Sequence, residues 1–171
     1  RRGLSSEDAR WVRQSGHNDA LEFAIAIGLP RDYRNDPKAK KDVIDPSGDA
    51  HSVKSGQKKW QIFLYGLGRF ESDDAFRVMN GVGDLLVECI KSFPETFVEY
   101  QANKTAAKER LRPHMRALMA KLTEKSRLRA FFNKSLFNMG EVDYLTIKHD
   151  GTFHVFLNHD VLTVLSTNLE V

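Results

Sequence analysis

The fold is decided by residues 41–55, which read KDVIDPSGDAHSVKS. Two short runs at 42–45 and 50–54 carry the polar and apolar alternation and the β-branched residues that are typical of strands. Between them, the Pro-Ser-Gly-Asp sequence at 46–49 favours a tight turn. The stretch therefore predicts an antiparallel β-hairpin.

One face of this hairpin gathers groups that suit phosphodiester chemistry. Alternation along the second strand puts Ser52 and Lys54 on one face and His51 on the other. A four-residue turn would place Asp45 on the face of Lys54, and a three-residue turn would place Asp42 there. Hydrolysis of a phosphodiester needs a metal ion that polarises the phosphate and a cation near the attacking water. Because Mg²⁺ prefers carboxylate oxygens, an aspartate that faces a lysine fits this need.

The order of the other expected elements indicates a mixed α/β (α+β) fold built of layers. Before the hairpin we expect one helix from Ser5 or Ser6 to Gln14, a break at Ser15-Gly16, and a second helix from Asn18 or Asp19 that ends at Gly28. After it we expect a strand at 59–65, a helix at 75–92, and a long helical stretch from Pro94 to Asn138 that Pro113 kinks or divides. The chain then returns to strands at 141–148 and 152–157 around a His149-Asp150-Gly151 turn, and ends with a helix at 160–165.

Length and composition point to one domain over residues 1–171. Its parts would be N-terminal helices at 1–30, the hairpin and strand at 41–70, a basic helical region at 75–138, and a C-terminal hairpin and tail at 141–171. Hydrophobic residues make up 41% of the chain and charged residues 29%, as in globular domains. No run approaches the roughly 18 apolar residues of a membrane helix, and no signal peptide is recognised, so no membrane partner is expected. The single cysteine, Cys89, excludes an internal disulfide and predicts a cytoplasmic protein.

Positive charge is concentrated in residues 101–135. This segment holds ten basic and two acidic residues, a net charge of +8, whereas the whole chain carries +3. A basic helical face is what a nucleic-acid-binding protein needs, although a solvated surface helix gives the same pattern. The residues expected to contact phosphates are Lys104, Lys108, Arg112, Arg116 and Lys121.

The hairpin resembles the PD-(D/E)xK nuclease superfamily, which includes many type II restriction endonucleases. Its pattern is an Asp on one strand, followed on the next by Asp or Glu, any residue, and Lys. Lys41-Asp42-Val43 resembles the strand with the first Asp, and Ser52-Val53-Lys54 stands at the acid-x-Lys triplet. The resemblance implies a restriction-endonuclease-like core, a central mixed β-sheet flanked by helices. It also implies that Asp42 binds the metal and that Lys54 orients or activates the attacking water.

Ser52 departs from this pattern, because a hydroxyl is a poorer Mg²⁺ ligand than a carboxylate. Some restriction enzymes of the superfamily also have Ser-x-Lys and recruit an acid from elsewhere. The candidates for that acid are Glu71, Asp45, Asp49 and Glu22. Glu71 is favoured, because it follows the next expected strand and would return to the same edge of the sheet.

Two further features support the resemblance, which covers residues 17–71. Residues 61–65 resemble the Gln-x-x-x-Tyr motif of some superfamily branches, which implies a supporting role for Gln61 at the catalytic site. Glu22 lies on a helix before the hairpin, where members of the superfamily often place an acid.

These observations predict a Mg²⁺-dependent DNA endonuclease of restriction or defence type, with Mn²⁺ as a substitute metal. A homodimer is expected, because such an enzyme must cut two strands of a symmetric substrate. One alternative is a non-catalytic nucleic-acid-binding module on a nuclease-like fold. Another is a protein-interaction domain whose basic helix meets an acidic partner. The choice between DNA and RNA stays open.

The second hairpin offers a competing site. Glu141 and Asp143 would lie on one face of a strand, but no lysine follows on the partner strand at 152–156. The other interpretation is an edge hairpin whose outward charges discourage aggregation.

Overall fold

The computed structural model describes residues 6–34, 41–57, 60 and 66–168. Where the sequence predicted one domain, the chain divides into two compact units. The first unit consists of residues 1–62 and 135–162, and the second of residues 63–134 and 163–171. The boundary falls inside two helices, α7 (Lys125–Phe137) and α8 (Asn158–Asn168).

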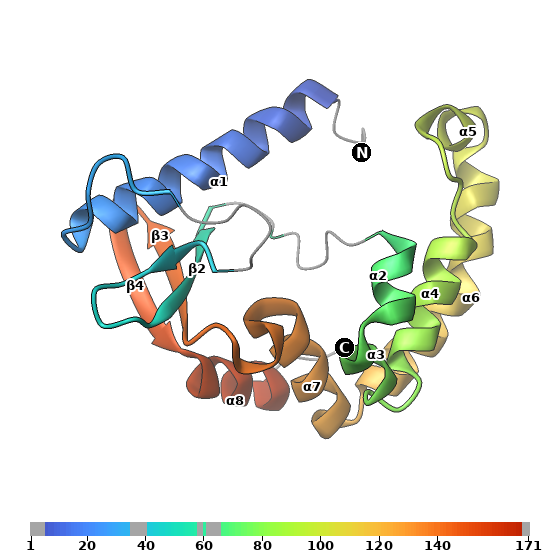
Figure 1. Ribbon diagram of the computed structural model, residues 1–171. Helices are drawn as coiled ribbons and strands as arrows, with labels where there is room; N and C mark the ends of the chain where they lie inside the picture. The colour runs from blue at the N-terminus through green and yellow to red at the C-terminus, as the bar shows by residue number, and fades with distance from the viewer. Residues whose placement is uncertain (1–5, 35–40, 58–59, 61–65, 169–171) are drawn as a thin grey trace. The chain divides into compact units, whose positions relative to one another are not determined.

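A four-stranded mixed sheet forms the first unit (Figure 1). Its strands are β1 (Val43–Ile44), β2 (Ala50–Ser55), β3 (Tyr144–His149) and β4 (Thr152–Leu157), and they lie in this order across the sheet. The β1–β2 and β3–β4 pairs are antiparallel, whereas β2 and β3 are parallel. Both predicted hairpins and the mixed sheet are confirmed, although β3 begins three residues later than the predicted strand.

Helix α1 (Ser6–Ala26) packs on one face of this sheet. Its residues Phe23 and Ala24 form a buried cluster with Val43 of β1 and Val53 of β2. The N–H groups of Gly28 and Leu29 bond back to the carbonyls of Ile25 and Ala24, and Gly28 has φ of +90°. This left-handed glycine ends the helix, as the sequence predicted.

The predicted break at Ser15-Gly16 is wrong, because α1 is continuous. A Cβ at Gly16 would meet no atom within 4 Å. Glycine in an exposed helix costs only about 1 kcal/mol relative to alanine. The apolar residues that α1 buries against the sheet outweigh that cost.

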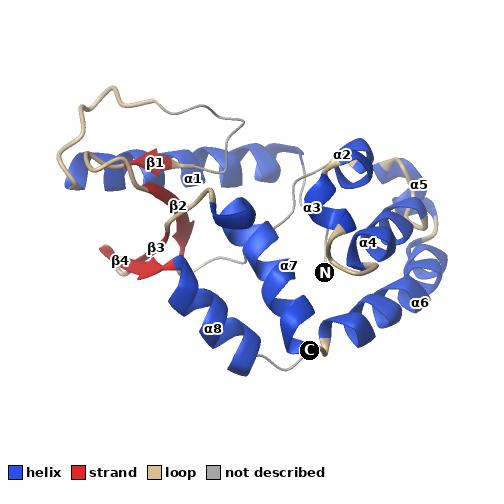
Figure 2. Cartoon of the chain, turned by 60° about the horizontal axis from the view of Figure 1, so that its bottom comes forward, coloured by secondary structure: helices blue, strands red, loops and turns tan. Residues whose placement is uncertain are grey.

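The second unit is helical in its described part (Figure 2). It begins with α2 (Leu67–Ser72), α3 (Asp74–Arg77) and α4 (Val82–Lys91), where the sequence predicted one helix over 75–92. That prediction is wrong, because Asn80 and Gly81 have φ of +51° and +86° and interrupt the helix. Cys89 is buried on α4, with its Sγ 3.7 Å from the Sδ of Met115, and burial raises the pKa of its thiol.

The long basic stretch forms α5 (Phe97–Ala102), α6 (Lys104–Leu122) and α7. Pro113 lies inside α6 and does not divide it. The divisions fall instead at Asn103, with φ of −150° and ψ of +76°, and at Thr123 and Glu124. Because a proline costs roughly 3 kcal/mol inside a helix, the packing of Leu118 and Leu122 on the same helix must compensate for it.

The chain re-enters the sheet through a short 3₁₀ turn, Asn138–Gly140. Asp150 and Gly151 have φ of +46° and +78° and form the predicted turn between β3 and β4. Helix α8 follows β4 directly and is longer than the predicted 160–165. The strand predicted at 59–65 lies almost wholly outside the described residues. No described helix is both long and apolar enough to cross a bilayer.

Candidate functional site

The register of the first hairpin decides which aspartate shares a face with Lys54. Val43 pairs with His51 and Ile44 with Ala50, and the N–H of Asp42 bonds to the carbonyl of His51 at 2.9 Å. The loop therefore has three residues between Asp45 and Asp49, the shorter of the two turns considered. Asp42 consequently lies across from Ser52 on the face that carries Lys54.

Three donors converge on a single oxygen of Asp42. Its Oδ2 accepts hydrogen bonds from the backbone N–H of Val53 at 2.7 Å and from the Ser52 hydroxyl at 3.3 Å. The Nζ of Lys54 lies 3.5 Å from the same oxygen. Ser52 is buried, whereas the side chains of Asp42 and Lys54 are 33% and 27% exposed. The site thus has a rigid base and two charged groups that solvent or a substrate can reach.

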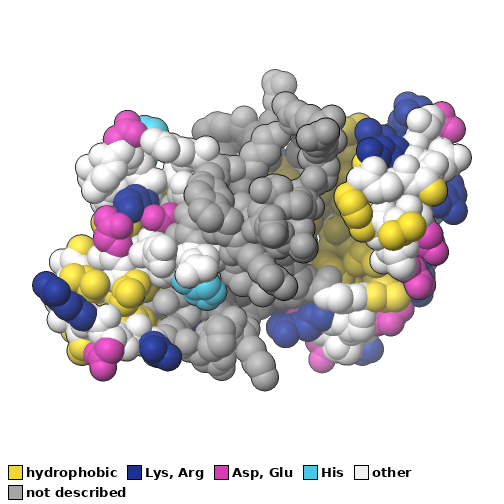
Figure 3. All heavy atoms as spheres, turned by 90° about the horizontal axis from the view of Figure 1, so that it is seen from above, with side chains coloured by type: hydrophobic (Ala, Val, Ile, Leu, Met, Phe, Trp, Pro, Cys, Tyr) yellow, Lys and Arg dark blue, Asp and Glu magenta, His cyan; other side chains and the backbone are white. Residues whose placement is uncertain are grey.

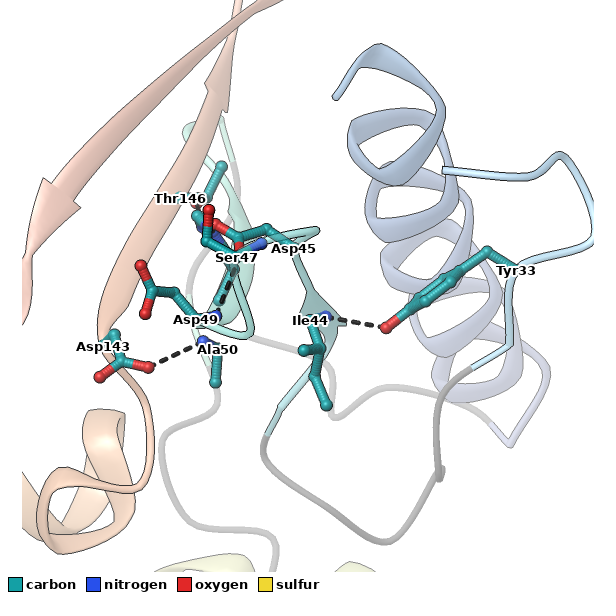
Figure 4. A network of polar contacts seen from close by, with 9 residues as sticks. Tyr33, Ile44, Asp45, Ser47, Asp49, Ala50, Asp143 and Thr146 are labelled. Carbon is teal, nitrogen blue, oxygen red and sulfur yellow. Dashed lines mark hydrogen bonds and ion pairs between the residues drawn. The ribbon is translucent and has the colours of Figure 1, made fainter. Parts of the chain in front are cut away.

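Asp45 builds the turn instead of joining Lys54 (Figure 4). Its Oδ1 accepts the N–H groups of Ser47 at 2.8 Å and Asp49 at 3.0 Å, and its Oδ2 lies 3.3 Å from Nε2 of His51. Burial alone would raise the pKa of Asp45. The bonds from Asp49, His51 and Ser47 outweigh burial and hold that pKa below its usual value. Both oxygens are engaged, so the predicted metal role of Asp45 does not match its environment.

Three residues of the distant strand segment contact the hairpin and fix it in place. The buried His51 ring has its Nδ1 2.9 Å from the Thr146 hydroxyl, and it stacks on Tyr144 at 4.9 Å. Asp143 accepts the N–H of Ala50 at 2.8 Å through its carboxylate (Figure 4). Sequence reasoning missed these contacts, because β2 and β3 are parallel and their pairing leaves no local pattern in the sequence.

Glu141 and Asp143, the competing pair on the second hairpin, each form a hydrogen bond with a different part of the fold. Asp143 is used by β2, and Glu141 accepts a hydrogen bond from the Asn138 amide at 2.6 Å. Both residues precede β3, so they do not share a strand face as the sequence predicted.

Glu22 lies on the other side of the sheet. Its Oε2 is 2.6 Å from Nζ of Lys148, which also contacts Asp19 at 3.1 Å. The hydrogen bond that Lys148 donates to Glu22 is the main reason why the pKa of Lys148 is raised. Tyr144 pairs with His51 and Lys148 pairs with Ser55, so alternation puts Lys148 on the same face as His51. His51 contacts Phe23 of α1 on that face. The structure therefore places Glu22 on the face opposite to Asp42, paired with Lys148, and does not bring the two carboxylates together.

The other two predicted supporting residues are not placed beside Asp42. Glu71 lies on α2 in the second unit and forms an ion pair with Lys91 at 3.0 Å. Gln61 lies outside the described residues. The second carboxylate of the predicted site thus stays a prediction.

Asp42 offers the single carboxylate that a magnesium site with few protein ligands needs. Mg²⁺ in proteins is often held by one or two carboxylates, with water and substrate phosphates as the remaining ligands. The three hydrogen-bond donors around Asp42 all contact Oδ2 of its carboxylate, and none of them contacts Oδ1. Among the described residues, no cluster of three or more His, Cys, Asp or Glu side chains offers a fuller set. Any metal there would depend on phosphate oxygens of the substrate.

A row of cations lies on α6. Lys104, Lys108, Arg112 and Arg116 are all exposed and are spaced four residues apart. Residues at this spacing occupy neighbouring positions on one helix side, about 6 Å apart along the axis. In the described part of the chain, none of the four lies within 4.0 Å of a carboxylate. We call these four residues the α6 basic row.

Other cations of the basic segment serve the fold. Lys134 is buried, and its Nζ lies 2.7 Å from Asp73 and over the ring of Phe76. Lys121 is half-buried and donates to the carbonyl of Asn80 at 3.4 Å. Because Lys134 is buried in the second unit, this residue adds its charge to the segment without belonging to its exposed basic surface.

Comparison with protein-family models, with curated proteins and with solved structures gives no match. The functional argument therefore depends on the residues themselves.

Proposed function

We propose that this protein is a Mg²⁺-dependent endonuclease that hydrolyses phosphodiester bonds of DNA, in a restriction or defence role. The observation that carries the proposal is the convergence of Asp42, Ser52 and Lys54 on one face of the hairpin. The α6 basic row supports a polyanionic substrate, because exposed cations that lack carboxylate partners bind phosphates by charge. A homodimer would allow both strands of a duplex to be cut.

Each residue of the site has a distinct task in this proposal. Lys54 holds and orients the attacking water, and its ammonium stabilises negative charge that develops on the phosphate. Asp42 keeps Lys54 in place and offers its second oxygen to the metal. Ser52 and the N–H of Val53 fix the Asp42 carboxylate in one orientation. When bound, Mg²⁺ or Mn²⁺ supplies Lewis-acid polarisation of the phosphate and lowers the pKa of the water.

The test is a cleavage assay on plasmid, phage and single-stranded DNA with Mg²⁺ or Mn²⁺. Wild type should cut at least one substrate, and Lys54→Ala and Asp42→Asn should each lower the rate by 100-fold or more. Asp150→Asn and Gln57→Ala are matched controls in the same unit, because both side chains are exposed and lie on turns. Wild-type activity in Lys54→Ala would contradict the assignment of this lysine. Absence of metal-dependent cleavage by wild type on all three substrates would contradict the enzyme proposal.

The second candidate is a nucleic-acid-binding module without catalysis. Ser52 favours it, since the hydroxyl donates to Asp42 and adds no second carboxylate. This candidate predicts salt-sensitive DNA binding that needs no divalent metal and produces no cleavage.

A further inference from the structure

An aromatic cluster lies next to the α6 basic row along the chain. It consists of Phe93, Phe97 and Tyr100, which we call the α5 aromatic cluster. The rings of Phe93 and Tyr100 are 5.2 Å apart and those of Phe97 and Tyr100 are 6.4 Å apart, all at tilted angles. Phe93 is 37% exposed and Phe97 is 56% exposed. Exposed aromatic rings are costly in water, so this cluster needs an explanation.

Capping hydrogen bonds define the ends of α5 and the start of α6 beside the cluster. Thr96 and Glu99 form a capping box at the start of α5, with bonds of 3.2 and 3.3 Å. Asn103 ends α5 and also caps α6, since its side chain accepts the N–H of Ala106 at 3.0 Å. One residue, Asn103, therefore ends α5 and begins α6.

Basic residues follow the α5 aromatic cluster closely along the chain. Lys104 and Lys108, the first two members of the α6 basic row, follow Tyr100 by four and eight residues. Figure 3 shows hydrophobic side chains beside Lys and Arg side chains over α5 and α6. The carboxylate of Glu99 is engaged by its capping bond, although Glu95 is exposed nearby. A ligand that suits both groups has an uncharged aromatic part and a phosphate part.

We propose that the α5 aromatic cluster stacks unpaired bases of single-stranded nucleic acid, while Lys104 and Lys108 bind the adjoining phosphates. Single strands are bound in this way by proteins that combine aromatic rings with a positively charged track. A paired duplex would present phosphates but no free base faces. This inference rests on the nucleic-acid binding of the proposed function and adds a preference for single-stranded or locally melted substrates.

The test measures binding of three probes at low salt: a 12-nucleotide oligothymidine, an abasic strand of the same length, and a 12-base-pair duplex. Wild type should bind oligothymidine about tenfold more tightly than the abasic strand. Phe97→Ala should remove this difference and leave affinity for the abasic strand unchanged. Val98→Ala is the matched control, because Val98 is 78% exposed on the same helix and has no ring.

A fluorescent variant gives a second measurement. Phe97→Trp keeps an aromatic ring, so it should retain the affinity for oligothymidine, and its emission should be quenched by this strand and not by the abasic one. Equal affinities of wild type for the oligothymidine and abasic strands would overturn the stacking proposal and leave nucleic-acid binding intact. Absence of binding to all three probes would overturn both proposals. Loss of affinity in Phe97→Ala that Phe97→Trp does not restore would show a structural effect, and would also reject stacking.

Discussion

The Nζ of Lys54 lies 3.5 Å from the Oδ2 of Asp42, across the β1–β2 hairpin and twelve residues away in the sequence. This contact depends on the three-residue loop, since one more residue would move Asp42 to the opposite face. The aspartate at the other end of β1, Asp45, holds that loop through its bonds to Ser47 and Asp49. The two aspartates therefore have separable roles that mutation can distinguish.

Asp42→Asn should lower cleavage strongly and change the free energy of unfolding by less than about 1 kcal/mol, because the ion pair is partly exposed. Asp45→Ala should leave cleavage unchanged at temperatures where the variant stays folded. It should lower the free energy of unfolding by roughly 1–2 kcal/mol, since two N–H groups lose their acceptor. Chemical denaturation and a cleavage assay on both variants measure this. If both variants are fully folded and lose cleavage activity equally, Asp45 also takes part in catalysis.

The Asp73–Lys134 ion pair should make the free energy of unfolding depend on pH in the acidic range. Burial alone would raise the pKa of Asp73, but hydrogen bonds from Lys134, Ala75 and Arg69 lower it below its usual value. The stabilisation is therefore present above the unfolded-state pKa of about 3.9 and is lost as pH falls through the folded-state pKa. Asp73→Asn should be less stable than wild type by about 3 kcal/mol at pH 7, since it removes the negative charge that lies 2.7 Å from the buried Lys134 ammonium.

The difference between Asp73→Asn and wild type should shrink below pH 4 and approach zero in stronger acid. Urea denaturation from pH 7 to pH 2 measures it. A constant difference over this range would mean that Asp73 does not titrate with the lowered pKa.

Gly83 should tolerate no side chain. A Cβ at Gly83 would lie 2.5 Å from the carbonyl oxygen of Phe76, a backbone atom that cannot turn away. Gly83→Ala should therefore destabilise the protein by roughly 1–3 kcal/mol, as overpacking does. Gly16→Ala is the control, because no atom lies within 4 Å of its Cβ, and it should stabilise α1 by about 0.5–1 kcal/mol. Thermal denaturation of both variants should move the midpoint in opposite directions.

The α6 basic row should set the salt dependence of nucleic-acid binding. Each cation that contacts a phosphate contributes about −0.9 to the slope of log affinity against log salt for duplex DNA. Lys108→Gln combined with Arg112→Gln should weaken binding to all sequences alike and reduce the slope by roughly 1.8. Arg77→Gln is a suitable control, because Arg77 is an exposed cation that is paired with Asp74 at 3.2 Å. A salt slope that stays unchanged in the double variant would exclude this row from the interface.

The parts of the fold that local sequence determines were predictable. Gly28 ends α1, Asp150 and Gly151 form the β3–β4 turn, and the hairpin around residues 46–48 is present. Local rules failed where tertiary packing decides the outcome. Gly16 and Pro113 lie inside helices that their packing maintains. Asn80-Gly81 is different, because this dipeptide favours a turn and positive φ, and the predicted helix was extended across it.

The candidate site shows the same division. The register that joins Asp42, Ser52 and Lys54 was one of two that the loop allowed, and only the structure selects it. Glu22 is an acid, as a metal ligand should be, but it lies on the face of the sheet opposite to Asp42. Its spacing from the hairpin along the chain does not indicate on which face it lies. The spacing of Phe93, Phe97 and Tyr100 by four and three residues is a helical signal for one cluster, and the sequence alone did not mark it as exposed.

The parallel pairing of β2 with β3 has a consequence for synthesis on the ribosome. Ala50 bonds to Asp143, which lies 93 residues later in the chain. At about 5–20 residues per second, β2 waits roughly 5–20 seconds after its own translation for this neighbour to be made. During that interval the hairpin is a nascent-chain segment with an open edge, which exposes it to chaperones and to aggregation. The arrangement of Asp42 and Lys54 therefore gains its full support only after the segment at 143–148 has been translated.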